Sequence, residues 1–104
     1  MALLGNPFVA NVTKQMTGDE LIQALRVDIA GELEAIIGYE AHIMATNDER
    51  AKKVLGHIAD EEKQHVGELQ QLLGILSPKD AEHTEKGKQA IIQQQQQNFQ
   101  APMQ

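Results

Sequence analysis

Repeated helix-start signals constrain the fold of this chain more than any other feature. A capping box, in which a hydroxyl residue is followed three positions later by glutamate, begins at Thr17 and again at Thr46. The hydrophobic periodicity between these signals predicts one helix over residues 18–45 and a second over residues 47–76. Because the connection between them is so short, the two helices must form an antiparallel hairpin.

The remaining segments complete the expected domain organisation. Ser77 followed by proline is typical of a helix start and predicts a third, shorter helix over residues 78–92. Residues 93–104 are a glutamine-rich polar stretch that we expect to form a flexible tail, and residues 1–16 are expected to form an extended arm. Residues 17–92 then form one helical domain. Nothing resembles a series of strands and turns, so the predicted fold class is all-α.

The composition excludes several classes of protein. A chain of 104 residues has room for a single domain. With 15 acidic and 9 basic side chains, its net charge of -6 makes a nucleic-acid partner unexpected, because a phosphate backbone requires a cationic surface. The absence of cysteine removes disulfides, thiolate zinc sites and iron–sulfur clusters. No signal peptide or membrane span is recognisable, so we expect a soluble, cytoplasmic protein without a membrane partner.

Both helices of the expected hairpin carry an apolar stripe that is interrupted near its middle. Each stripe recurs in alternating steps of three and four residues, which places its members on one helix face. The members are Leu25, Ile29, Glu32, Ile36, Tyr39 and Ile43 in the first helix, and Leu55, Ile58, Glu62, His65, Leu69, Leu72 and Leu76 in the second. Two antiparallel helices cannot bury both stripes alone, so we expect a partner subunit to complete a four-helix bundle.

The interruptions place Glu32 on one helix opposite Glu62 and His65 on the other. A carboxylate in a desolvated seam costs several kcal/mol unless it is paired, protonated or bound to a metal ion. Glu62 and His65 are three positions apart, so both can reach the same ion, and Glu32 can approach from the facing helix. Two carboxylates and an imidazole suit iron or manganese and can also bind zinc.

This ligand set is half of a two-metal site. In ferritin-like di-iron proteins, two helices each provide a Glu and the other two each provide a Glu-x-x-His motif. One copy of this chain supplies one of each, so two copies related by a twofold axis would supply the whole set. We therefore expect a homodimer with two metal ions between its chains. Tyr39 lies on the same stripe as Glu32, where it can hydrogen-bond a ligating carboxylate or donate an electron.

Two segments carry a resemblance to a known family. The first is Glu32 to Ala35 with Tyr39, and the second is residues 59–68, with the sequence ADEEKQHVGE. They resemble the rubrerythrin and ferritin-like superfamily and, within it, the encapsulated ferritins, in which a two-helix hairpin replaces the usual four-helix subunit. The similarity covers roughly residues 17–76 and continues into the expected third helix.

The resemblance implies a ferroxidase that oxidises Fe(II) to Fe(III) inside an encapsulin nanocompartment, whose shell stores the mineral. It implies that Glu32, Glu62 and His65 bind the iron, that Glu62 bridges the two ions, and that Ca, Zn or Mn can substitute for iron. It also implies homodimers within a larger ring, a decamer. Residues that match an iron route in the family are Glu34, His57 and Glu61. Considered without the family, these three fit solvated surface groups better.

Other functions compete with the ferroxidase interpretation. A rubrerythrin-like peroxide reductase would consume peroxide at the same site, although a chain without cysteine lacks the rubredoxin-type iron site that receives electrons in such proteins. A non-catalytic helical assembly module would use the charged layer only to fix helix register. A hydrolytic two-metal enzyme has no substrate-binding motif to support it. Iron-dependent assembly and the choice of oxidant distinguish the first two from the ferroxidase.

Overall fold

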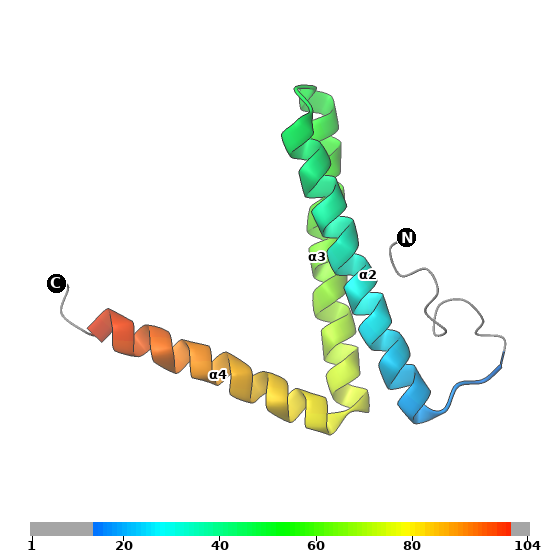
Figure 1. Ribbon diagram of the computed structural model, residues 1–104, viewed down its shortest axis with the longest axis vertical. Helices are drawn as coiled ribbons and strands as arrows, with labels where there is room; N and C mark the ends of the chain where they lie inside the picture. The colour runs from blue at the N-terminus through cyan, green and yellow to red at the C-terminus, as the bar shows by residue number, and fades with distance from the viewer. Residues whose placement is uncertain (1–13, 101–104) are drawn as a thin grey trace.

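The computed structural model describes residues 14–100, which form three helices (Figure 1). They are α2, Gly18–Ala45; α3, Glu49–Leu76; and α4, Pro78–Gln100. Helices α2 and α3 run antiparallel and side by side, and α4 leaves the end of α3 in a different direction. The described residues contain no strand, so the all-α prediction and the hairpin are confirmed. None of these three helices combines the length and apolar character that a membrane crossing requires.

The start of α2 is the capping box that the sequence predicts. The Thr17 hydroxyl accepts a hydrogen bond from the Glu20 backbone N–H at 3.2 Å, and the Glu20 carboxylate accepts one from the Thr17 N–H at 3.0 Å. Each bond satisfies a backbone donor that has no partner within the helix. The hydrogen bonds from Thr17 lower the pKa of the Glu20 carboxyl, because they favour its charged form.

The start of α3 differs from the prediction by two residues, because Asp48 rather than Thr46 is its cap. The Asp48 carboxylate accepts hydrogen bonds from the backbone N–H groups of Arg50 at 2.9 Å and Ala51 at 3.2 Å. The Thr46 hydroxyl instead accepts a bond from the Asp48 N–H at 3.1 Å and stabilises the turn. Aspartate is a strong capping residue, and its carboxylate binds the free N–H groups at the start of α3. Asp48 therefore takes the capping role that was predicted for Thr46.

Helix α4 begins at Pro78 as predicted but continues to Gln100, so its predicted end near Ile92 was wrong. Residues 93–100 are helical and were expected to belong to a flexible tail. Glutamine is a good helix former, and no glycine or proline interrupts the chain between Gly87 and Gln100. Of the expected terminal arm and tail, residues 1–13 and 101–104 lie outside the described residues. The proposed domain limits of 17–92 stay a prediction.

A polar clamp fixes the junction of α3 and α4. The Arg26 guanidinium, from α2, donates to both oxygens of Asp80 at 2.9 Å, and the Ser77 hydroxyl donates to the same carboxylate at 2.7 Å. The Ser77 hydroxyl and Arg26 hold the pKa of Asp80 below its ordinary value. A Cβ atom at Gly74 would lie only 3.3 Å from the Cβ of Ala81, so glycine allows the two helices to approach closely here.

Few side chains of the described residues are buried, and all of them belong to the hairpin. They are Ala24, Leu25 and Ala59, which are 9%, 5% and 2% exposed. Large apolar side chains that remain exposed are Leu33, Ile37, Met44, Val54, Leu72, Ile75, Leu76, Ile91 and Ile92. From residue 81 to residue 98, every side chain of α4 is exposed. The described part of one chain therefore leaves much of its apolar surface uncovered, as expected of a hairpin whose two stripes exceed what it can bury.

Candidate metal centre

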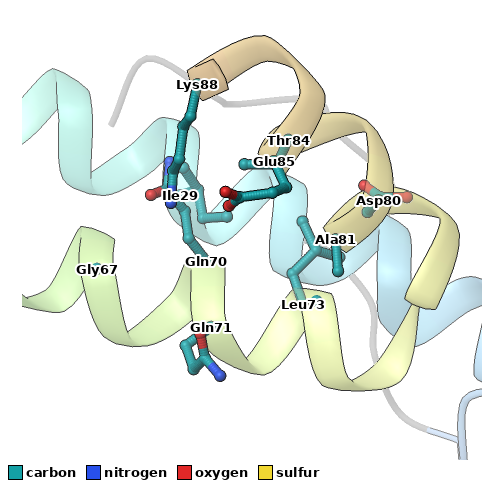
Figure 2. Close-up of a pocket in the computed structure, with 11 residues that line it drawn as sticks. Ile29, Gly67, Gln70, Gln71, Leu73, Asp80, Ala81, Thr84, Glu85 and Lys88 are labelled. Atoms are coloured by element: carbon teal, nitrogen blue, oxygen red, sulfur yellow. The ribbon is translucent and has the colours of Figure 1, made fainter. Parts of the chain in front are cut away.

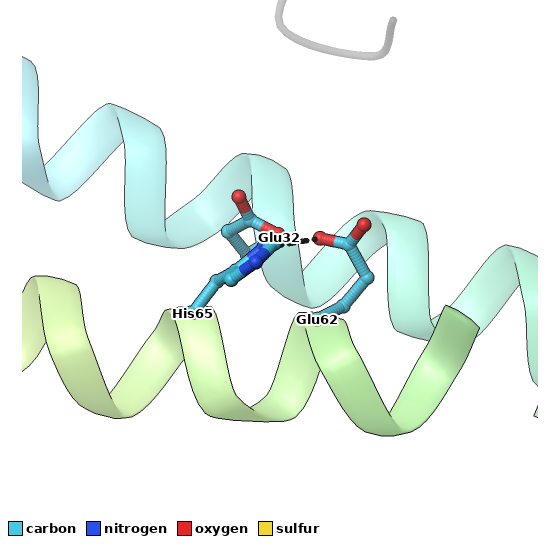
Figure 3. Close-up of side chains that lie close together, drawn as sticks. All are labelled: Glu32, Glu62 and His65. Carbon is cyan, nitrogen blue, oxygen red and sulfur yellow. Dashed lines mark ion pairs between the residues drawn. The ribbon is translucent and has the colours of Figure 1, made fainter. Parts of the chain in front are cut away.

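The structure brings the three predicted metal ligands together at the middle of the hairpin (Figure 3). Glu32 projects from α2, and Glu62 and His65 project from successive turns of α3. Nδ1 of His65 lies 3.5 Å from Oε2 of Glu32 and 3.4 Å from Oε2 of Glu62. One ligand atom from each residue lies within 4.8 Å of the others, which is a spacing that one metal ion can span.

One oxygen of Glu32 has no hydrogen-bond partner although it is buried. Its Oε2 atom is shielded from solvent and accepts no hydrogen bond, because the contact with His65 lacks hydrogen-bond geometry. A buried carboxylate oxygen without a partner costs free energy that a bound cation would recover. The donors also match the chemistry of a divalent metal ion, since two carboxylates and an imidazole suit iron, manganese or zinc. The residues present therefore fit a metal ion.

The centre is only partly enclosed by its own chain. The side chains of Glu32 and Glu62 are 25% and 19% exposed, whereas that of His65 is 47% exposed. Three donor residues also leave coordination positions unfilled, because transition metals bind four to six ligands. One chain thus provides an incomplete site that is open on the His65 side.

A tightly packed alanine and an ion pair link the two helices on either side of Glu62. Ala59, one turn before Glu62, is the most buried residue of the hairpin, and its small side chain allows α2 and α3 to approach closely. Next to Glu62, the Lys63 ammonium on α3 lies 3.0 Å from the Glu40 carboxylate on α2. The hydrogen bond to Glu40 and its negative charge raise the pKa of Lys63, because both favour the charged ammonium.

The secondary candidates lie outside this group of three ligands. His57 and Glu61 pair with each other at 2.6 Å and are 74% and 51% exposed, so they occupy a solvated face of α3. Glu34 is partly exposed and does not join the group. Tyr39 is half-buried on α2, and no hydrogen bond links it to Glu32 among the described residues. The roles predicted for these four residues stay predictions.

Sequence reasoning missed one residue beside the centre. A cavity of about 180 Å³ adjoins the ligands and is lined by Glu32, His65, Glu68 and Leu69. Glu68 lies three positions after His65, so it extends the same helix face by one turn. The spacing of three residues from His65 is the sequence signal that could have identified Glu68. The prediction considered only members of the two apolar stripes, and Glu68 is not one of them.

A larger cavity of about 410 Å³ lies at the junction of α3 and α4 and has a different character (Figure 2). Ile29, Leu73 and Ala81 contribute apolar surface to it. Its acidic residues include Asp80, which is already paired with Arg26. Among the described residues, the group formed by Glu32 and its two neighbours is therefore the candidate for metal binding.

Several known proteins are similar in sequence to this chain. The model of the family described as "Ubiquinone biosynthesis protein COQ7" matches residues 19–82. The encapsulin nanocompartment cargo protein EncC of Myxococcus xanthus is 42% identical over 81 residues, which cover 78% of this chain and 62% of that protein. The ferritin-like-encapsulin shell fusion protein of Pyrococcus furiosus is 44% identical over 73 residues, which cover 70% of this chain and 21% of that protein. The chain thus spans less than two thirds of either relative.

A solved structure has the same fold. The encapsulated ferritin domain from Pyrococcus furiosus superposes with a TM-score of 0.74 at 38% sequence identity. The match covers 83% of this chain and 88% of that domain, so the likeness extends over nearly all of both molecules. The resemblance inferred from the sequence is confirmed. The chain therefore belongs to the family that the COQ7 model describes and, by its similarity to the solved domain, to the encapsulated ferritins.

Proposed function

We propose that this chain is a ferroxidase, which oxidises Fe(II) to Fe(III) at a di-iron site shared by two copies. The observation that carries the proposal is the convergence of Glu32, Glu62 and His65, with one buried oxygen of Glu32 lacking any hydrogen-bond partner. Two copies would contribute four carboxylates and two imidazoles, which is the ligand set of ferritin-like di-iron sites. The second copy would relate to the first by a twofold axis, because both must contribute the same residues.

The surface next to the ligands supports this arrangement. Val54, His65 and Leu72 are separated by 11 and 7 residues, close to whole numbers of helical turns, so they share one face of α3. Val54 and Leu72 are 58% and 42% exposed. We name this surface the His65 face. The His65 face contains both the open side of the metal centre and exposed apolar side chains. A second copy that packs against this face would therefore bury both.

The proposed chemistry transfers one electron from each of two Fe(II) substrate ions to a shared oxidant. With dioxygen, two Fe(II) and two protons give two Fe(III) and one hydrogen peroxide. With peroxide as oxidant, two Fe(II) and two protons give two Fe(III) and two waters. The anionic carboxylates of Glu32 and Glu62 favour the product, because they stabilise Fe(III) more than Fe(II). Tyr39 is proposed to hydrogen-bond a ligand or supply an electron, and Glu34, His57 and Glu61 are proposed to lie along an iron route.

The relatives suggest where this reaction takes place. Two of them are named as an encapsulin cargo protein and a fusion with an encapsulin shell. We propose that this chain likewise associates with an encapsulin shell protein in the cytoplasm and that the shell stores the Fe(III) product. Homodimers would assemble there into a larger ring, for which a decamer is proposed from the family resemblance.

Anaerobic Fe(II) titration with the oligomer mass measured in parallel tests the proposed function. We expect saturation near one iron per chain, iron-linked association, and rapid Fe(III) formation when air is admitted. Glu62→Ala and His65→Ala should lose both iron binding and oxidation. His83→Ala removes an exposed histidine of α4 and should behave as the wild type does.

Two results would contradict the ferroxidase proposal in different ways. Association that is identical with and without iron, together with oxidation no faster than in buffer, would leave a structural assembly module. Peroxide consumption that continues at the expense of a supplied reductant, without accumulation of Fe(III), would instead favour a peroxide reductase.

A further inference from the structure

The cavity beside the metal centre shows from which side an ion can reach the ligands. Two of its lining residues, Glu32 and His65, are candidate ligands, and Glu62 does not line it. His65 is also the most exposed of the three ligands. An ion that approaches from solvent through this cavity therefore meets Glu32 and His65 before Glu62. The other two lining residues are Glu68, which is exposed, and Leu69, which is half-buried.

Glu68 differs from the other acidic side chains along α3 because no basic side chain lies within ion-pair distance of it among the described residues. The other acidic residues of α3 and its cap each have such a neighbour: Asp48 has Arg50, Glu49 has Lys52, Asp60 has Lys63, Glu61 has His57, and Glu62 has His65. An unpaired carboxylate keeps its full charge available for a passing cation, whereas a paired one is partly neutralised. Glu68 is thus an unpaired acid of α3 at the edge of this cavity.

We propose that, in the single chain and before a second copy covers the His65 face, Glu68 captures divalent cations at the edge of this cavity and transfers them to Glu32 and His65. This role rests on the proposed ferroxidase site and adds an access residue to it. Glu68 lies one helical turn beyond His65 on the same face, so a hydrated ion held by its carboxylate is already next to the imidazole. The charge of Glu68 raises the local cation concentration, and Leu69 adds apolar surface to the same open depression.

Binding kinetics of the full chain test this role without requiring oxidation. Stopped-flow absorbance measures the association rate of Co(II), and Fe(II) oxidation is followed in parallel over a range of Fe(II) concentrations. For Glu68→Gln we expect the Co(II) association rate and kcat/KM for Fe(II), both measured from the metal-free, unassembled chain, to fall on the order of three- to tenfold. The Co(II) stoichiometry and kcat at saturating Fe(II) should not change. Higher ionic strength should reduce the difference, because salt screens the charge of Glu68.

A matched variant separates this local effect from the loss of one negative charge. Glu82→Gln removes the same charge from α4, where Glu82 is paired with Lys86, and should associate with Co(II) at the wild-type rate. Glu34→Gln tests the alternative route that the family resemblance suggests. A rate loss in Glu34→Gln without one in Glu68→Gln would overturn the proposal, as would equal losses in Glu68→Gln and Glu82→Gln.

The remaining outcomes distinguish the access role from the proposed function. A reduced Co(II) stoichiometry in Glu68→Gln would make Glu68 a permanent ligand and refute the capture role. If the wild type binds Co(II) but does not oxidise Fe(II), the ferroxidase proposal fails while the association rates still decide the role of Glu68. If the wild type binds no Co(II), both proposals are wrong.

Discussion

Replacing Val54 by glutamine should weaken the metal-linked dimer without unfolding the hairpin. Val54 belongs to the His65 face and is 58% exposed, so little of its side chain contributes to the core of a single chain. Glutamine also has a higher helix propensity than valine, so α3 itself should not be destabilised. The substitution places a polar amide where a second copy is expected to cover an apolar group.

The expected loss of dimer stability can be calculated from the exposed fraction of Val54. Full burial of a side chain of this size stabilises by about 1.5–3 kcal/mol, so the 58% that is still exposed can contribute roughly 0.9–1.7 kcal/mol. A twofold interface contains Val54 twice, which gives about 1.7–3.5 kcal/mol for the dimer when the interface covers it fully. At about 1.4 kcal/mol per factor of ten, the dimer dissociation constant should rise roughly 15- to 300-fold.

Sedimentation equilibrium with Co(II) bound measures this constant, and Ile37→Gln is the matched control. Ile37 is 67% exposed and lies one turn from Glu40, which pairs with Lys63. Lys63 and His65 are two residues apart, so their directions around α3 differ by about 160°. Ile37 is therefore on the opposite side of the hairpin. The reasoning is refuted if Val54→Gln changes the constant less than twofold, or if Ile37→Gln weakens the dimer as much.

Other substitutions test the core, the centre and the helix junction. Leu25→Ala should lower the free energy of unfolding by about 2–4 kcal/mol in urea titrations, because Leu25 is only 5% exposed. Glu32→Gln should raise the Tm of the metal-free protein, since it removes a poorly partnered charge, yet abolish the Tm increase that Co(II) gives to the wild type. Because the folded-state pKa of Asp80 is lowered from 3.8, its contribution to stability is present above that value and lost as pH falls through the lowered pKa. NMR of the α3–α4 junction should thus show loosening in acid, and Arg26→Ala should shift this transition to higher pH.

The hairpin could be predicted from sequence because its determinants are local. The Thr17 capping box and the three-and-four periodicity specify α2 with no reference to distant residues. At the start of α3, two capping residues lie close together, and the choice of Asp48 over Thr46 depends on the path of the turn. The end of α4 was missed because a glutamine run has helix propensity but no apolar periodicity, which was the signal used.

The candidate site could be predicted for a related reason. A charged group within an apolar stripe is conspicuous, so Glu32, Glu62 and His65 stand out from the seam. The role proposed for Glu68 depends instead on which side of the centre is open, and exposure is a property of the folded hairpin. Periodicity gives the face of a residue but does not show whether another helix covers that face.

The ion pair between Arg26 and Asp80 holds α4 near its first residue, so a small rotation there is amplified along the length of the helix. The 23 residues of α4 extend about 34 Å at ~1.5 Å per residue. A rotation of about 10° at the junction would therefore displace the far end of the helix by roughly 6 Å. Because Gly74 and Ala81 meet at this pivot, the addition of a single methyl group there would change which surfaces the distant glutamines can touch.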